Sequence, residues 1–201
     1  MSTSTAPRAL GTSRERAKAH RRSALLHAAA DLFAARGFER VSLEDLGAAV
    51  GISGPAVYRH FASKQAVLAA LLIDVSRELI AGADAVVASS VPDSDKLREL
   101  IAFHVEFALS NPDVIVVQDR DLDSLAPDDL TSVRQLQRGY IENWVGVLAG
   151  IHPGVPIAQL RIRARATFGL INSTPHSART APQASVRSLL ESMALAALTK
   201  R

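Results

Sequence analysis

Residues 41–64, VSLEDLGAAVGISGPAVYRHFASK, decide the fold prediction. Ser42 stands where a helix would begin, and Asp45 follows three residues later, which is the spacing of a capped first turn. The apolar residues that follow recur at helical spacing until Gly51 interrupts them. The segment therefore predicts a short helix that ends in a tight glycine turn.

A second short helix is predicted directly after this turn. Ser53 is its expected cap, and Pro55 lies in its first turn, where the missing amide donor costs nothing. Val57 and Phe61 are spaced to face inward. Two short helices joined by a glycine turn form a helix-turn-helix. The outward positions carry donors that suit phosphate oxygens, namely Tyr58, Arg59, His60 and Lys64.

The turn at residues 51–53 (Gly-x-Ser) and the pattern Tyr-x-His-Phe-x-x-Lys at residues 58–64 closely resemble the DNA-binding signature of the TetR family of repressors. The specific match covers residues 20–70, about a quarter of the chain. The resemblance implies an all-α fold in which the second helix of the motif enters the major groove. It also implies a homodimer that reads a palindromic operator in double-stranded DNA.

By position, the resemblance implies base-edge contacts from Gly54, Pro55, Ala56 and Tyr58, and phosphate contacts from Ser42, Tyr58, His60 and Lys64. None of residues 54–56 can form a bidentate pair with a base, so we expect readout through thymine methyl groups, backbone groups, Tyr58 and Arg59, with DNA shape contributing. Taken alone, Tyr58 could pack over the first helix and His60 could be a plain surface residue. The complete predicted DNA-binding set is Ser42, Ser53, Gly54, Pro55, Ala56, Tyr58, Arg59, His60 and Lys64.

Charge is unevenly distributed over the 201 residues, whose formal net charge is +3. Residues 1–64 hold ten Lys and Arg against five Asp and Glu, and residues 65–201 hold thirteen against fifteen. A basic head on a mildly acidic body is typical of a nucleic-acid-binding protein, although a basic tail can also be merely solvated. We therefore predict a disordered basic tail at 1–13, a DNA-binding domain at 14–64 and a helical ligand-binding and dimerisation domain at 65–201.

Composition excludes several classes of protein. The chain has no cysteine, so disulfides, thiol catalysis and thiolate metal sites are excluded. No apolar run approaches the roughly 20 residues that span a bilayer, and the first dozen residues lack a secretory signal. We expect a soluble cytoplasmic protein that does not enter membranes. Helical periodicity recurs along the whole chain and strand alternation is absent, which predicts about nine helices.

The aromatic residues of the body predict a cavity among its helices. The predicted lining is Phe103, His104, Phe107, Tyr140, Trp144, Phe168 and Asn172. An apolar cavity with a few polar groups is the usual small-molecule site, but the same aromatics could be ordinary core residues. His104 has no Asp or His at metal-ligand spacing, so we predict neither a metal nor another cofactor.

Two carboxyl-terminal segments have apolar faces that are too wide for one small body to cover. We expect a second copy to cover them, and the resemblance implies a four-helix interface made by the last two long helices of each chain. The predicted interface is Ile157, Leu160, Ala164, Phe168, Ile171, Val186, Leu189, Leu190, Met193 and Ala197. Arg161, Arg163 and Arg165 are interpreted as a solvated rim, and phosphates of a coenzyme A-type effector are the alternative that their charge permits.

These features favour a ligand-responsive repressor that an apolar small molecule releases from its operator. Residues 168–175 resemble the corresponding stretch of actinobacterial TetR-type regulators of lipid and sterol catabolism, which suggests an acyl or steroid thioester as effector. An architectural DNA-binding protein without an effector is the alternative. An enzyme is the third hypothesis, but the chain has no nucleophile elbow, phosphate loop, zinc motif or positioned carboxylate pair.

Overall fold

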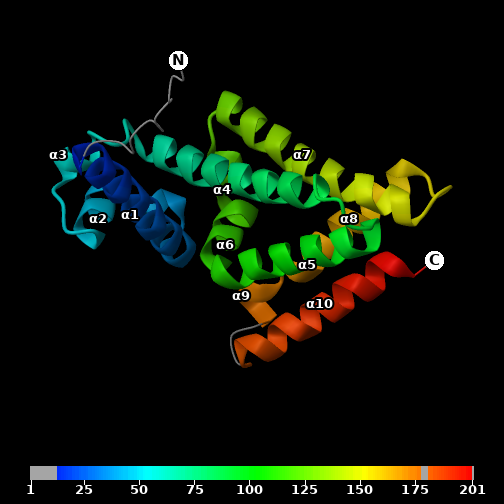
Figure 1. Cartoon of the computed structure of the whole chain (residues 1–201). Helices are drawn as coiled ribbons and strands as arrows, with labels where there is room; N and C mark the ends of the chain where they lie inside the picture. The colour runs from blue at the N-terminus through cyan, green and yellow to red at the C-terminus, as the bar shows by residue number, and fades with distance from the viewer. Residues whose placement is uncertain (1–12, 178–180, 201) are drawn as a thin grey trace, which may run out of the picture.

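The computed structural model describes residues 13–177 and 181–200, which are helical apart from turns and connections (Figure 1). The all-α prediction is therefore confirmed. The elements in order are α1 (Ser13–Arg36), the 3-10 turn η1 (Phe38–Arg40), α2 (Leu43–Ala49), α3 (Gly54–Val57), α4 (Lys64–Val87), α5 (Asp93–Ser110), α6 (Pro112–Asp121), the 3-10 turn η2 (Leu122–Ser124), α7 (Pro127–Ile151), α8 (Ile157–Ile171), α9 (Thr174–Ser177) and α10 (Gln183–Thr199).

The first helix and the turn of the helix-turn-helix form as their local signals predict. The Ser42 hydroxyl accepts from the Asp45 amide at 3.1 Å, and the Asp45 carboxylate accepts from the Ser42 amide at 2.8 Å, which completes a capping box. This hydrogen bond from the Ser42 backbone is the main cause of the lowered pKa of Asp45. Gly51 turns the chain with a φ of +71°, a conformation that suits glycine.

A glycine also lets α3 approach α2 closely. A Cβ atom on Gly47 would lie 2.8 Å from the Ile52 carbonyl oxygen and 3.0 Å from Cγ2 of Val57. Any larger residue would push α3 away from α2. The second helix of the motif is only one α-helical turn, and Ser53 precedes it without a side-chain capping hydrogen bond.

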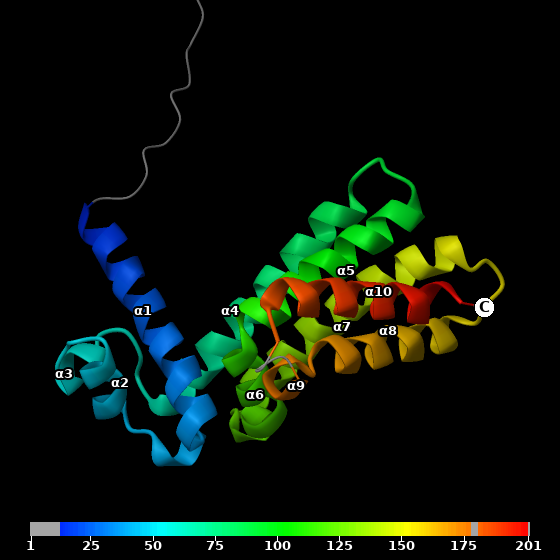
Figure 2. The same cartoon turned by 90° about the horizontal axis from the view of Figure 1, so that it is seen from below.

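The long helix α4 joins the α1–α3 head to the body, as Figure 1 shows. The Ser63 hydroxyl caps it by accepting from the Ala66 amide at 3.1 Å. Arg22 of α1 donates to Asp74 of α4 at 2.7 Å and so ties the first helix to the connecting one. In the body, α4 packs along α7. Helix α8 packs on α7, and α10 packs on α5 and α8 (Figure 2).

Helix α6 packs on α1 of the head and also contacts α5 and α9 of the body. One apolar cluster unites the α1–α4 core with Val114 and Val117 of α6, and a second cluster holds the core of α5, α7, α8 and α10. Burial of the α6 side chains against the head couples the position of this helix to that of the head.

Several local predictions need correction. The polar residues 119–123 predict a connection between helices, but α6 continues to Asp121 and η2 follows it. The helical pattern is lost after Ile171, which predicts a loop, but this stretch contains the short helix α9. The predicted tail at 1–13 lies outside the described residues except for Ser13, which begins α1. The predicted domain boundary at 64/65 falls at the start of α4, and both domain ranges stay predictions.

A search of the described residues for a single helix long and apolar enough to cross a membrane finds none. The pair Asp93–Ser110 and Pro112–Ser124 passes the same test together, by length and composition only, with an 85° bend between its members.

Candidate nucleic-acid interface and ligand cavity

The predicted DNA-binding residues lie at the surface of the head. Ser42, Ser53, Pro55, Tyr58 and Arg59 are exposed, while Gly54, Ala56, His60 and Lys64 are half-buried. Tyr58 leaves 55% of its surface to solvent, which is unusual for a large ring. A shallow groove passes between Tyr58, Ser42 and Lys64, at the amino-terminal ends of α2 and α4. Helix amino-termini favour anions, so the groove suits a phosphate.

Lys64 has a structural role that its sequence motif did not reveal. Its Nζ donates to the carbonyl oxygens of Phe38 and Glu39 at 2.8 and 3.1 Å, and lies 4.4 Å from the centre of the Phe38 ring. The side chain therefore fastens the η1 turn to the start of α4. Phosphate contact by Lys64 stays a prediction beside this role.

His60 is surrounded by positive charge. Partial burial is the main cause of its lowered pKa, and Lys18, Arg21 and Arg59 contribute through their charges. The imidazole is therefore neutral at pH 7, and the basic residues near the start of α1 lie close enough to the motif to raise its positive potential.

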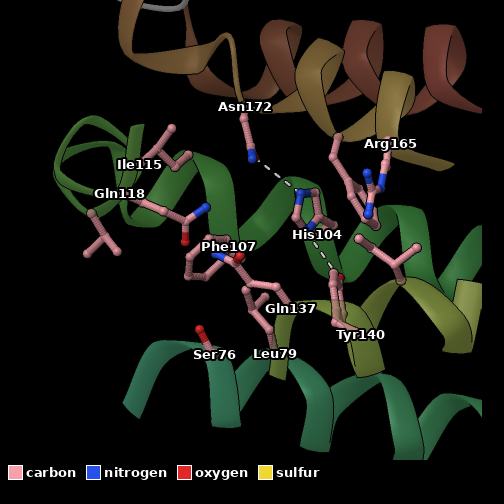
Figure 3. Close-up of a pocket in the computed structure, with 13 residues that line it drawn as sticks. Ser76, Leu79, His104, Phe107, Ile115, Gln118, Gln137, Tyr140, Arg165 and Asn172 are labelled. Atoms are coloured by element: carbon pink, nitrogen blue, oxygen red, sulfur yellow. Dashed lines mark hydrogen bonds between the residues drawn. The ribbon is translucent and has the colours of Figure 1, made fainter. Parts of the chain in front are cut away.

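A cavity of about 260 Å³ lies between the head-packed helix α6 and the remaining body helices (Figure 3). Five helices, α4 to α8, contribute to its walls. The lining residues are Ser76, Leu79, His104, Phe107, Val114, Ile115, Gln118, Gln137, Tyr140, Ile141, Arg165, Phe168 and Asn172.

A chain of hydrogen bonds links three helices at one wall of the cavity. His104 on α5 contacts the Tyr140 hydroxyl of α7 through Nδ1 at 3.0 Å and Oδ1 of Asn172, at the end of α8, through Nε2 at 3.1 Å (Figure 3). Burial lowers the pKa of His104 to about 4 and raises that of Tyr140. Because Oδ1 of Asn172 only accepts, the neutral imidazole carries its hydrogen on Nε2, and the tyrosine donates to Nδ1.

Aromatic rings pack around this chain. The Phe168 ring centre lies 4.8 Å from that of His104 and 5.4 Å from that of Tyr140. Trp144 meets Phe168 edge-on at 5.0 Å. The wall is therefore well packed, which holds the polar groups of His104 and Tyr140 in fixed positions.

Five of the seven predicted pocket residues line the cavity, and two do not. Trp144 is fully buried behind the lining. Phe103 packs on Gly82 of α4, where a Cβ atom would lie only 2.2 Å from the ring, so it fills the contact between α4 and α5 instead. Whether the lining residues bind an effector stays a prediction.

Eight lining residues were not predicted from the sequence: Ser76, Leu79, Val114, Ile115, Gln118, Gln137, Ile141 and Arg165. Helical spacing carried a signal for some of them. Gln137 precedes Tyr140 by three residues, and Arg165 precedes Phe168 by three, so each shares a face with a residue that was identified.

The outer face of α8 and α10 exposes large apolar side chains. Ile157, Leu189 and Met193 of the predicted interface are 47%, 58% and 44% exposed, and Ala197 is exposed beside them. Ile162, which the prediction missed, is the most exposed at 68%. Several large apolar side chains exposed on two neighbouring helices are typical of a protein–protein interface.

The interface prediction is corrected at four positions. Leu160, Ala164, Ile171 and Leu190 are at most 6% exposed, because α8 and α10 bury them against the core of their own chain. They therefore offer no surface to a partner. Phe168 and Val186 are half-buried, and Phe168 faces the cavity.

The three arginines of α8 have different surroundings. Arg161 forms two hydrogen bonds with the Glu142 carboxylate, at 2.7 and 3.0 Å. Arg163 donates to the carbonyl oxygen of Lys200 at 3.1 Å. Arg165 lines the cavity. Arg165 is also exposed, so the predicted solvated rim stays a prediction for it beside its place in the cavity lining.

Two family models match most of the chain. Residues 25–71 match "Bacterial regulatory proteins, tetR family", and residues 90–176 match "Tetracyclin repressor-like, C-terminal domain". The first range contains the helix-turn-helix, and the second contains most of the cavity lining.

Curated relatives include a transcriptional repressor and a nucleoid occlusion factor. The transcriptional repressor KstR2 of Rhodococcus jostii is 32% identical over 139 residues, which cover 68% of each chain. The nucleoid occlusion factor SlmA of Serratia proteamaculans is 30% identical over 100 residues, and the matched segment covers about half of that protein.

Similar solved structures include the ketosteroid regulator KstR2 of Mycobacterium tuberculosis, with a TM-score of 0.75, 24% identity and coverage of 90% of this chain and 96% of that one. FadR of Bacillus subtilis, solved with stearoyl-CoA, has a TM-score of 0.70 at 14% identity and covers 87% of this chain and 98% of its own. These likenesses show a shared fold.

Proposed function

Because the chain belongs to the TetR family of bacterial regulatory proteins, we propose that it is a ligand-responsive transcriptional repressor that an apolar small molecule releases from a palindromic operator. The family resemblance predicted from residues 51–64 is confirmed by the match over 25–71. The observation that carries the proposal is the position of the cavity, between a helix packed on the DNA-binding head and the helices of the body.

Helix α6 provides a route from the cavity to the head. Its Ile115 and Gln118 line the cavity, while Arg120, at its end, donates to the carbonyl oxygens of Phe33 and Ala34 near the end of α1. A ligand that fits between α6 and α8 favours the arrangement with α6 displaced, and the head moves with it. Such a shift of population changes the distance between two heads in a dimer.

The dimer itself rests on the exposed face of α8 and α10. Ile162, Leu189 and Met193 would be covered by the same residues of a second copy related by a two-fold axis. A two-fold dimer presents two helix-turn-helix motifs to the two halves of a palindrome.

An acyl or steroid thioester is the proposed effector. The name of the Mycobacterium KstR2 refers to ketosteroids, and the FadR structure contains stearoyl-CoA. The apolar side chains of the lining, among them Phe107, Ile141 and Phe168, favour an apolar ligand.

The likeness to SlmA favours a second candidate, an architectural DNA-binding protein without an effector. Fluorescence anisotropy with a duplex from the chain's own promoter separates the two. A repressor binds the duplex in a salt-sensitive manner and dissociates when decanoyl-coenzyme A is added. An architectural protein binds duplex DNA and ignores the thioester. We propose a binding protein rather than an enzyme, acting on DNA in the cytoplasm.

A further inference from the structure

We propose that the cavity takes an amphiphilic ligand whose anionic group is bound by Arg165 at the α8 edge while its apolar body lies between α6 and α7. This inference rests on the proposed function, since it assumes that the cavity is the effector site. It names the ligand chemistry that the site selects.

Arg165 is the charged residue among the thirteen that line the cavity. It extends from α8 toward the side of the cavity where His104 and Tyr140 lie (Figure 3). Among the described residues, no hydrogen bond or salt bridge joins Arg165 to an acidic side chain. Its charge is therefore available to a ligand.

The other charged residues near α8 explain why the Arg165 guanidinium has no acidic hydrogen-bond partner among the described residues. The Glu142 carboxylate is the acidic group whose pKa Arg165 influences, but both of its oxygens are held by Arg161. Arg163 turns away to the end of α10, where it binds the Lys200 carbonyl. Of the three α8 arginines, Arg165 alone lines the cavity.

The part of the lining that the structure describes contains no acidic side chain to neutralise Arg165 and no second cationic side chain. Burial keeps the His104 imidazole neutral and the Tyr140 hydroxyl protonated. Gln118 and Gln137 add uncharged amides. One anionic group beside Arg165 has one cation as partner, whereas a second anionic group inside the mostly apolar cavity would have none.

The size of the cavity limits the apolar body. A volume of about 260 Å³ lies just below the usual range of ligand pockets, roughly 300–1,000 Å³. At about 30 Å³ for each water-sized group, it holds on the order of ten heavy atoms. The anionic group would then lie at the rim, next to the exposed Arg165. The carboxylate of a free acid and a phosphate of a coenzyme A thioester both have this chemistry.

Isothermal titration of the full chain with three probes tests the inference. The probes are decanoate, decanoyl-coenzyme A and the neutral methyl decanoate. We expect at least one anionic probe to bind about tenfold more tightly than the ester, and the stronger of the two identifies the source of the anion. Arg165→Gln should weaken that probe by about tenfold and leave the ester unchanged. Arg163→Gln, with the same charge change on the same helix, should keep the preference.

Three results would overturn the inference: equal binding of ester and anionic probes, a preference that survives Arg165→Gln, or no binding of either anionic probe. Promoter binding measured on the same preparation keeps this outcome separate from the proposed function. Intact DNA binding without a charge preference rejects only the ligand chemistry, whereas loss of DNA binding rejects the proposed function itself.

Discussion

The guanidinium of Arg120, at the end of α6, donates to the carbonyl oxygen of Ala34 in α1 at 3.2 Å, and it also binds the carbonyl of Phe33. The neighbouring Asp121 carboxylate orients it through hydrogen bonds at 2.9 and 3.0 Å. These contacts join a wall of the cavity to the last turns of the first helix of the head. We expect them to carry the effect of a ligand to the DNA-binding surface.

Replacing Arg120 should uncouple ligand binding from DNA release. In Arg120→Ala the end of α1 loses its donors, so an effector should still bind, but its effect on promoter affinity should fall several-fold. Anisotropy titrations with and without effector measure this ratio. Arg134→Ala, which removes an exposed arginine 3.5 Å from Asp123, is the matched control. An unchanged ratio in Arg120→Ala would exclude this route.

Tyr58→Ala should weaken promoter binding with little effect on folding. The ring is 55% exposed, so its removal leaves no cavity in the core, and surface substitutions typically change stability by within about 0.5 kcal/mol. Thermal unfolding and anisotropy on the same sample check both parts. If Tyr58→Ala binds the promoter with wild-type affinity, Tyr58 does not contact the DNA.

Lys64→Ala, in contrast, should lower stability as well as DNA affinity. The change removes two hydrogen bonds to the η1 carbonyls and the contact with the Phe38 ring. Discounted for partial exposure, we expect a loss of about 1 kcal/mol in the free energy of unfolding. Urea unfolding measures it, with Arg59→Ala as the control for loss of an exposed charge. A variant as stable as the wild type would contradict the structural role of Lys64.

His104 should make the protein less stable in mild acid. In the folded chain the pKa of His104 is about 4, below its ordinary value of 6.5. Between these two values the unfolded chain binds a proton at His104 while the folded chain keeps the imidazole neutral. Stability therefore falls as the pH drops from 6.5 toward 4, by about 2 kcal/mol between pH 6.5 and 5. Urea unfolding at pH 7.5 and 5 should show this loss reduced in His104→Gln. Equal losses in both proteins would argue against a buried neutral histidine.

An acidic residue on the exposed α8–α10 face should produce monomers. Ile162→Asp places a charge where two apolar faces would meet, whereas Val91→Asp alters a residue that is 36% exposed in the connection between α4 and α5. Sedimentation equilibrium should give a dimer for the wild type and the control, and a monomer for Ile162→Asp. A dimer that survives the change would require another interface.

Local signals explain why the head could be predicted closely. The Ser42 cap, the Gly51 turn and the Ser63 cap each act within a few residues, so the pattern alone predicts the elements. The apolar run at 114–117 is harder to assign from the sequence, because its β-branched residues suit a strand as well as a helix. In the structure this run belongs to α6, which packs on α1.

Contacts between distant helices explain what the sequence could not predict. Phe103 and Phe107 are one turn apart on α5, yet only Phe107 lines the cavity, because Gly82 leaves room for the Phe103 ring against α4. On α8, Leu160 and Ile162 are equally apolar, and only the position of α8 on the core decides that Leu160 is buried and Ile162 exposed.

Native mass spectrometry of the full chain with its promoter duplex is the decisive experiment. We expect a species of two chains, a complex of two chains on one duplex, and loss of that complex when the effector is added. A single chain that forms no complex with the duplex at any salt concentration would contradict this expectation.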